Sequence, residues 1–268
     1  MDLAYIKQNW KNEMNVSLSE SIRAWDSVAE DYIYDQTISF EKNEFLRYLQ
    51  KKIVFTEDME ILDVGCGAGA YSLAIADKVR RVVGVDFSPK MIELARDSAA
   101  ERSILNSEFL ERDWYACSIE EFRGKFDLVF AHTTPAIADY TSFIKMLEAS
   151  RKYCVLCKPV RRTDAVFDQL RKLAGQETSN NDDSAAYIFD TIWGYGFNPE
   201  VSYQKTVWRS KKTIQEAREW YLGRLKGACV LDEKTEEMIN RYLEEISVEG
   251  IITETTHTTL ITFFWEVD

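Results

Sequence analysis

The chain has 268 residues, which is enough for one large domain or for one domain with a sizeable insertion. Apolar residues make up 46% and aromatic residues 13% of the sequence, so the chain can bury a substantial core and is not disordered as a whole. Lys and Arg number 33 against 45 Asp and Glu, and the net charge of −12 argues against a partner held by its phosphates, such as a nucleic acid.

The N-terminus and the cysteines favour a cytoplasmic protein. Residues 1–7 lack the basic segment and apolar run of a secretory signal. No run approaches the roughly 18 apolar residues that a membrane span needs. The five cysteines, an odd number, fit a reducing compartment better than a disulfide framework. We therefore expect no membrane association, and the sequence leaves the oligomeric state open.

Residues 1–57 favour helix, and an alternation of strands and helices follows. Strands are predicted at 60–64, 82–85, 108–110, 126–130 and 153–157, and helices near 70–79, 89–100, 136–150 and 162–174. Ser88 is the expected N-cap of the second of these helices, with Pro89 at its first position. Such alternation predicts right-handed βαβ units and a buried parallel sheet with helices on both faces.

The alternation ends after residue 174. The pattern predicts a polar loop at 175–184, an aromatic segment at 187–197, a strand at 201–208 and helices at 213–225 and 232–246. The last run, residues 255–265, is strongly β-favouring. Aromatic residues of the flanking segments are expected in the core of a cap, and a few of them in an apolar acceptor pocket; they are Trp10, Tyr34, Trp193, Tyr195, Phe197, Trp208, Trp220 and Tyr221.

The most informative segment joins a predicted strand to a predicted helix. Residues 65–69 read Gly-Cys-Gly-Ala-Gly, and these glycines let the backbone pass close to a ligand and expose amide groups at the helix start. The loop alone is a weak signal, because it also meets the relaxed pattern of dinucleotide-binding proteins. A nicotinamide-dependent oxidoreductase therefore stays open as an alternative at this point.

Two carboxylates at strand ends refine this interpretation. Asp63 precedes the first glycine by two residues, where it would repel a pyrophosphate but suits a ligand that carries an ammonium group and a sulfonium. Asp86 ends the next strand, 19 residues after Gly67, where a carboxylate accepts hydrogen bonds from both hydroxyls of a ribose. The alternative for Asp63 is an ordinary acid at a helix start or in a loop, and for Asp86 an ordinary acid at the N-terminus of a helix.

Together these motifs resemble a class I S-adenosylmethionine (SAM)-dependent methyltransferase of the small-molecule type, over roughly residues 20–160. Residues 63–69 resemble the first motif of the family, residues 83–88 the second, and residues 126–130 the fourth strand. Residues 25–32 resemble an aromatic-x-x-x-Ala-x-x-Tyr helix that often closes over the cofactor. The resemblance implies that SAM is bound by Tyr32, Asp63, Gly65, Cys66, Gly67, Asp86, Phe87, Asp113 and Trp114.

The resemblance also implies the parts of the fold and of the site. We expect a Rossmann-like α/β sheet of about seven strands, the last of them antiparallel. Residues 1–57 would form an N-terminal helical cap, 58–160 the SAM-binding core, and 161–268 the rest of the sheet with substrate-cap insertions. Asp63 and the glycine loop would hold the methionine end of SAM, Asp86 the ribose, and Asp113 with Trp114 the adenine. A bulky Trp114 after Asp113 departs from the Asp-Ala or Asp-Leu that is common there.

His132 is the candidate for a catalytic base. It follows the fourth strand, beside the expected methyl group, and its ordinary pKa near 6.5 suits proton removal at neutral pH. The alternative is a histidine that lines the pocket or hydrogen-bonds a loop carbonyl. The segment from His132 to Pro135 lacks the Asn/Asp-Pro-Pro-aromatic tetrapeptide of DNA amino-methyltransferases, which again disfavours nucleic acid.

Two further clusters have simpler interpretations. Cys154 and Cys157 have the spacing of a redox or zinc pair but lie in a predicted strand, where residues three apart point to opposite faces, so no metal site is expected. Residues 158–162 form a basic cluster that is either a solvated loop or a contact for an anionic group on the acceptor.

The function predicted from the sequence is in-line methyl transfer from SAM to an O, N, S or C atom of a small molecule. The remaining alternatives are a non-catalytic SAM-binding module and a protein or nucleic-acid methyltransferase.

Overall fold

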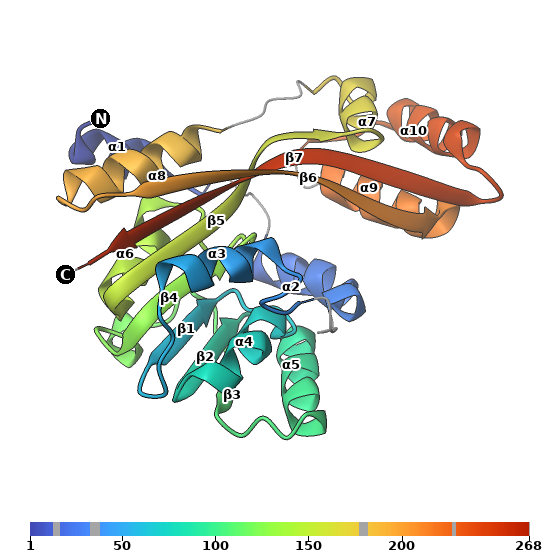
Figure 1. Ribbon diagram of the computed structural model, residues 1–268. Helices are drawn as coiled ribbons and strands as arrows, with labels where there is room; N and C mark the ends of the chain where they lie inside the picture. The colour runs from blue at the N-terminus through green and yellow to red at the C-terminus, as the bar shows by residue number, and fades with distance from the viewer. Residues whose placement is uncertain (13–16, 33–37, 177–181, 227–228, 268) are drawn as a thin grey trace.

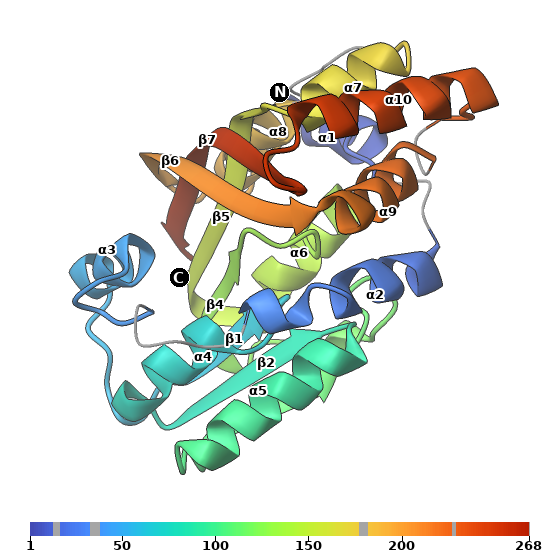
Figure 2. The ribbon, with the colours of Figure 1, turned by 90° about the vertical axis from the view of Figure 1, so that its right-hand side faces the viewer.

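The computed structural model describes residues 1–12, 17–32, 38–176, 182–226 and 229–267, which form a mixed sheet with helices on both faces (Figures 1 and 2). Its seven strands have the order β3-β2-β1-β4-β5-β7-β6. β7 runs antiparallel to β5 and β6, as predicted for the last strand, and the other neighbouring strands are parallel. The strands are β1 (Glu60–Val64), β2 (Arg81–Asp86), β3 (Ser107–Glu111), β4 (Phe126–His132), β5 (Ser150–Asp164), β6 (Glu200–Thr213) and β7 (Ile251–Glu266).

The helices follow the predicted order, and the predicted start of α5 is confirmed. Ser88 Oγ accepts a hydrogen bond from Met91 N at 3.1 Å, and Pro89 is the first helical residue. No helix of the described residues is long and apolar enough to cross a membrane. The helices are α1 (Leu3–Asn9), α2 (Leu18–Asp26), η1 (Ala29–Tyr32), α3 (Glu44–Lys52), α4 (Ala70–Ile75), η2 (Ala76–Lys78), α5 (Pro89–Glu101), η3 (Ile119–Glu121), α6 (Tyr140–Ala149), α7 (Phe167–Leu173), α8 (Asp183–Gly194), α9 (Ile214–Lys226) and α10 (Glu233–Ile246), with η for short 3₁₀ helices.

The sheet separates two apolar layers. Val129 and Cys154 belong to the cluster that includes residues of α1, α6 and α8. Phe130 and Cys157 belong to the cluster on the other face, with residues of α3 and α4. Cys154 and Cys157 therefore lie on opposite faces, as predicted, because side chains alternate along a strand.

The strand order reverses between β1 and β4, and this reversal positions the site. Consecutive βα units turn away from one another at such a point, which leaves a crevice at the carboxyl ends of the two strands. The loop after β1 carries the glycines, and the segment after β4 begins at His132. Segments more than 60 positions apart in the sequence are thus brought to one edge of the sheet.

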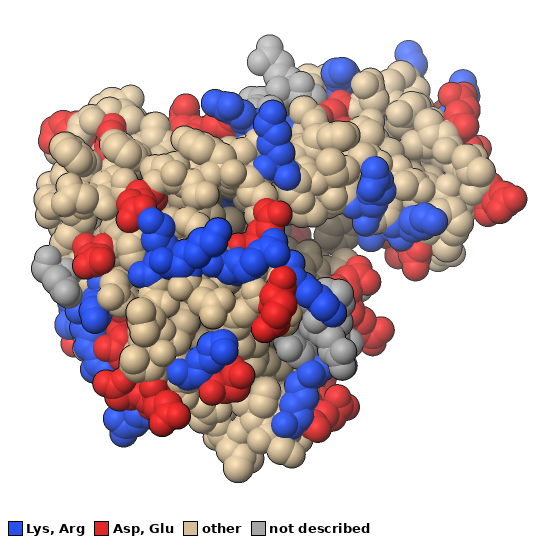
Figure 3. All heavy atoms as spheres, in the orientation of Figure 1, with Lys and Arg blue, Asp and Glu red and all other residues tan. Residues whose placement is uncertain are grey.

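Three strands extend well beyond the rest and carry a second, smaller core. β5, β6 and β7 have 15, 14 and 16 residues, against five in β1. Beside their extensions lies a group of helices, α7, α9 and α10, which we call the helical lobe (Figure 1). Its apolar cluster is made by Val166, Phe167, Leu170, Ala217, Tyr221, Leu225, Ile239, Leu243 and Ile252. In Figure 3 the surface is hollowed between this lobe and the body of the molecule.

Two predicted helix boundaries are wrong at their N-terminal ends. The helix expected over 162–174 begins at Phe167, because residues up to Asp164 continue β5 through pairing with β7. The helix expected over 136–150 begins at Tyr140, where the Asp139 side chain caps it by accepting from Ser142 N. Both errors arise because a long-range pairing or a cap outweighs local helix preference. Of the residues in the predicted polar loop, 177–181 lie outside the described part, as does Tyr34.

Candidate cofactor and active site

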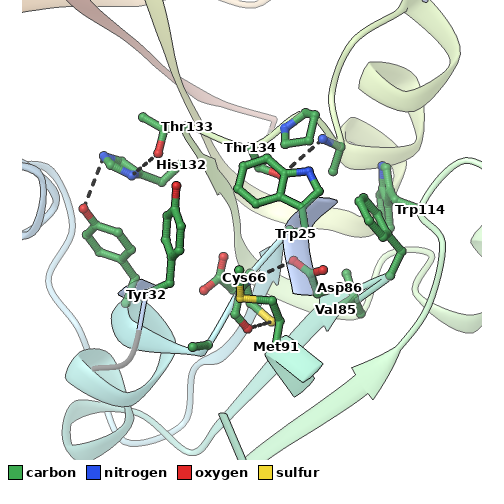
Figure 4. Close-up of a pocket in the computed structure, with 18 of the residues that line it drawn as sticks. Trp25, Tyr32, Cys66, Val85, Asp86, Met91, Trp114, His132, Thr133 and Thr134 are labelled. Carbon is green, nitrogen blue, oxygen red and sulfur yellow. Dashed lines mark hydrogen bonds between the residues drawn. The ribbon is translucent and has the colours of Figure 1, made fainter. Parts of the chain in front are cut away.

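A pocket opens at the carboxyl ends of β1, β2 and β4. It includes about 810 Å³ of empty space when the space open to solvent at its mouth is counted. In Figure 4, Trp114 and His132 lie toward opposite ends, with Cys66 and Asp86 between them. The lining residues are Trp25, Tyr32, Asp63, Gly65, Cys66, Gly67, Ala68, Ala70, Tyr71, Val85, Asp86, Phe87, Met91, Arg112, Trp114, His132, Thr133, Thr134, Pro135 and Ala136.

The glycine loop is held tightly between two strands. Gly65 N and Cys66 N donate to the carbonyl of Val85 at 2.8 and 3.0 Å, so the loop begins fixed to β2. Gly65 has a φ of +72°, and a Cβ atom there would lie 2.0 Å from Thr134 Oγ1. Glycine is therefore required at this position, both for the backbone conformation and for the close approach to the segment after β4.

Asp63 is a buried carboxylate whose charge is not balanced within the described chain. Ser72 Oγ donates to its Oδ2 at 2.7 Å, and among the described residues it forms no ion pair. Burial raises the pKa of Asp63 to about 7, and the Ser72 hydrogen bond opposes this rise only in part. A ligand ammonium group would supply the missing positive charge, so this position fits the methionine end of SAM.

Asp86 closes the glycine loop from the neighbouring strand. Its Oδ2 accepts from Gly67 N and its Oδ1 from Ser88 N, each at 2.9 Å. Burial raises the pKa of Asp86, and these backbone hydrogen bonds oppose the rise. Each oxygen keeps a second lone pair, which leaves the carboxylate able to accept from the two hydroxyls of a ribose. Phe87 lines the pocket next to it.

The residues predicted for adenine are separated by the structure. The Trp114 side chain lines the pocket and is 2% exposed, and its Nε1 donates to the carbonyl of Ser142 at 3.0 Å. The Asp113 carboxylate is not part of the lining, and it accepts from Tyr115 N at 2.9 Å. Arg112, which sequence reasoning did not single out, lines the pocket instead.

His132 lies at the other end among aromatic rings. Its Nε2 is 3.5 Å from Tyr71 Oη and its Nδ1 is 3.2 Å from Thr133 Oγ1, while the Phe45 ring centroid is 4.4 Å away. Burial lowers the pKa of His132 to about 3, so the imidazole is neutral at physiological pH. A neutral imidazole accepts a hydrogen bond at its unprotonated nitrogen. Burial opposes the uptake of a second proton, because that proton would charge the ring.

The backbone beside His132 is strained. Thr133 has a φ of +51°, a region that β-branched residues rarely occupy. Its amide donates to the carbonyl of Cys157 at 2.8 Å, which holds the residue in place against β5. Strain of this kind is typical of binding and catalytic sites.

The N-terminal segment contributes two aromatic residues to the pocket. The rings of Trp25 and Tyr32 meet edge to face, with centroids 5.8 Å apart, and Tyr32 remains 48% exposed (Figure 4). Of the predicted cap, α2 and η1 thus reach the site, whereas α1 packs against α6 and α8. Trp25 carries the aromatic position of the motif that pointed to Tyr32, whereas Tyr71 and Thr133 had no sequence signal beyond their place next to a motif.

A family profile described as a methyltransferase domain matches residues 55–221. The chain belongs to the class I SAM-dependent methyltransferases. It is therefore an enzyme with SAM as cofactor, as the motifs predicted, and the nicotinamide-dependent alternative falls away.

Curated relatives act on different acceptors. The release factor glutamine methyltransferase of Haemophilus influenzae is 24% identical over 80% of this chain and 71% of its own length. The demethylmenaquinone methyltransferase of Lactococcus lactis is 31% identical over 39% of this chain and 43% of its own length. Another release factor glutamine methyltransferase, from Vibrio cholerae, is matched over 21% of its length. The family is thus clear, whereas the relatives leave the acceptor open.

Solved structures share the fold. The phosphoethanolamine N-methyltransferase 2 of Haemonchus contortus, solved with phosphomonomethylethanolamine and S-adenosylhomocysteine, has a TM-score of 0.54 at 17% identity, over 100% of this chain and 66% of its own. The YcgJ protein of Bacillus subtilis has a TM-score of 0.50 at 18% identity, over 81% and 96% of the two chains. At these identities the likeness concerns the fold alone, and it confirms the predicted Rossmann-like sheet.

Proposed function

We propose that this methyltransferase transfers the methyl group of SAM to a small molecule. The observation that carries the proposal is the aromatic wall of the pocket: Trp25 and Tyr32 line it together with the glycine loop, and their rings meet edge to face, so an acceptor would have to fit against these rings. A net charge of −12 further disfavours a nucleic acid.

The roles of the cofactor residues follow from their chemistry and belong to this proposal. Bound SAM supplies an electrophilic methyl group on a sulfonium. Asp63 would pair with its ammonium group, Asp86 would accept from the ribose hydroxyls, and Trp114 would pack against the adenine. Asp113, with its carboxylate turned to Tyr115 N, would act by holding the turn on which Trp114 stands. The residues then contribute orientation and exclusion of water, on which an in-line displacement depends.

His132 would position the acceptor in this scheme. Its neutral ring can accept a hydrogen bond from a hydroxyl or amine of the acceptor, which directs a lone pair of that atom toward the methyl group. The pKa of about 3 makes it a weak general base, so the proton would leave to solvent after transfer.

The test is an acceptor screen that measures formation of S-adenosylhomocysteine. The full chain is incubated with SAM and, separately, with panels of phenols, amines, thiols and carboxylic acids, with glutamine-containing peptides, and with RNA. We expect turnover with a member of the small-molecule panels and its loss in Asp63→Asn. Turnover confined to the peptides or to RNA would overturn the small-molecule proposal.

A further inference from the structure

Strand β5 contains a β-bulge, and the alternation of its side chains between the two faces of the sheet shifts by one residue there. Its register with β7 passes from Val160↔Thr259 to Thr163↔His257, so residues 161 and 162 together stand opposite one residue. Arg161 has a φ of +51°, and its amide donates to both carboxylate oxygens of Asp182, at 2.9 and 3.1 Å. A bulge of this kind re-aims the side chains that follow it.

The bulge turns Arg162 toward the face on which His132 lies. Before it, Val160 packs into the cluster beneath α6 and α8, and Cys157 into the cluster on the opposite face. Strict alternation would give Arg162 the face of Val160. Instead Arg162 pairs with Asp164, which accepts from Thr256 Oγ1 and lies on the same face as Cys157.

The same face of β7 is polar between two apolar clusters. Leu260 belongs to the cluster of the main sheet and Ile252 to that of the helical lobe. The inward residues between them are Glu254, Thr256 and Thr258, each no more than 8% exposed. All three are hydrogen-bonded within the chain: Glu254 accepts from Phe167 N, and Thr256 and Thr258 donate to Asp164 and to the Val160 carbonyl, so the strip holds Asp164 in place beside Arg162.

The guanidinium of Arg162 is held by a carboxylate along one edge, and its other edge is available to a ligand. Its Nε and Nη2 donate to the two oxygens of Asp164 at 2.8 Å each, and its guanidinium lies over the Trp208 ring at 5.7 Å. Within the described part of the chain, Nη1 makes no hydrogen bond, and the side chain is 39% exposed. A guanidinium fixed by a carboxylate in this way is pre-organised for an anion on its remaining edge.

Arg162 lies on the same face of the sheet as His132, because His132 pairs with Cys157 of β5 and the bulge gives Arg162 the face of Cys157. Burial raises the pKa of Tyr32, and the charge of Arg162 opposes that rise, so the guanidinium is within electrostatic reach of the phenol. The other charged groups nearby are Arg224, which packs on the Phe167 ring at 3.9 Å, and Glu254, which accepts from Phe167 N at 3.0 Å.

We propose that Arg162 binds an anionic group, a carboxylate or a phosphate, on the methyl acceptor. The acceptor would span from this guanidinium past Tyr32 to the His132 end of the pocket. The inference rests on the proposed function, because it specifies the class of small molecule that is methylated. It selects one of the two interpretations of the basic cluster at residues 158–162.

The test measures anion binding to the full chain saturated with S-adenosylhomocysteine. The probes are benzoate, phenyl phosphate and neutral benzamide. The binding of each is measured by calorimetry or ligand-observed NMR. The variant is the double substitution Arg162→Gln with Asp164→Asn, which removes both members of the pair and so leaves no unpaired buried charge. Arg209→Gln is the matched control, because Arg209 pairs with Thr255 of β7 and lies exposed on the opposite face.

We expect benzoate or phenyl phosphate to bind the wild type and Arg209→Gln, and to bind the double variant at least about tenfold more weakly. The stronger of the two probes identifies carboxylate or phosphate. Equal binding to the double variant, or benzamide binding as tightly as the anions, would overturn the inference, as would binding of neither anion. The melting temperature and the affinity for S-adenosylhomocysteine show that the variants are folded.

The result is separable from the proposed function because no turnover is needed. If anions bind through Arg162 but only peptides are methylated, the small-molecule proposal is wrong and the anion site is supported. Methylation of neutral small molecules without anion binding would do the reverse.

Discussion

Ser72 donates a hydrogen bond from its Oγ to Asp63 Oδ2 at 2.7 Å, and both side chains are buried beneath the glycine loop. The hydroxyl satisfies one oxygen of the carboxylate without neutralising its charge. The burial of this charge raises the pKa of Asp63 to about 7. Cofactor binding should therefore depend on pH through this residue.

We predict that affinity for S-adenosylhomocysteine rises with pH up to about 7. Below that pH the free enzyme holds Asp63 protonated, and the proton must leave before the carboxylate can pair with the ligand ammonium. The affinity should rise by about tenfold per pH unit between pH 5 and 6 and level off near 7. Calorimetry at several pH values checks this.

Two variants at this pair serve as controls. Asp63→Asn should bind more weakly at pH 7 and show a flat profile. Ser72→Ala should move the midpoint above 7, because the Ser72 hydrogen bond lowers the pKa of Asp63. An unchanged slope in Asp63→Asn would assign the pH dependence to another group.

Asp63 should also destabilise the cofactor-free protein at high pH. Its pKa is raised in the folded state, so the folded protein binds more protons than the unfolded chain between about pH 4 and 7, and stability falls as the pH rises through this window. Asp63→Asn should therefore melt at a higher temperature than the wild type at pH 8, and the difference should shrink at pH 4. A lower melting temperature for Asp63→Asn at pH 8 would contradict the buried-charge argument.

Gly65→Ala should be far more damaging than alanine at another glycine with positive φ. The backbone strain alone costs about 1–2 kcal/mol. At Gly65 the new Cβ also meets Thr134 Oγ1 at 2.0 Å, whereas at Gly124, with a φ of +61°, it meets nothing within 4 Å. Urea unfolding of Gly65→Ala and Gly124→Ala separates the two effects, and equal losses of stability would show that the contact with Thr134 is unimportant.

His132 should stay neutral throughout the physiological range. Its pKa near 3 predicts no change in its ring NMR shifts between pH 5 and 8. The chain has two histidines, so His132→Asn identifies the signal. This variant should lower turnover and leave the affinity for S-adenosylhomocysteine within a few-fold. A resonance that titrates near pH 6.5 and disappears in His132→Asn would restore the interpretation of His132 as a general base.

Trp25 should control the release of the cofactor. Its ring lines the pocket beside Tyr32, so Trp25→Ala removes part of the cover and should speed dissociation of S-adenosylhomocysteine by roughly tenfold, which corresponds to about 1.4 kcal/mol. Trp193→Ala is the comparison, because Trp193 lies on α8 outside the pocket and is 62% exposed. Stopped-flow displacement measures both rates, and equal rates would show that α2 does not close the site.

The strand–loop–helix motif could be predicted because it depends on neighbours in the chain. A buried strand, glycines that permit positive φ, and acids at strand ends place Asp63 and Asp86 at one pocket whatever the rest of the fold does. The helix start at Ser88 and Pro89 is equally local, and it is confirmed. The order of these motifs was enough to predict the family, the cofactor and the form of the sheet.

The side chain that faces the adenine position could not be predicted from the sequence in the same way. Asp113 and Trp114 are adjacent, and which of them enters the pocket depends on a turn held by Tyr115 and on the contact of Trp114 with Ser142. The contact with Ser142 forms only when α6 packs against the sheet, so the residue pattern alone does not separate the two side chains.

The sequence by itself determined the family, the cofactor and the parallel core of this protein, because those depend on local spacing and on the period of apolar residues. The tertiary structure decided the length of β5, the covering of the pocket and the direction of Arg162. Asp164 meets Thr256 across 92 residues of sequence, in the part of β5 that continues past its bulge, and Arg162 there lies on the face of the sheet that carries His132. A side chain whose direction is set by so distant a partner carries no trace of that direction in the residues around it.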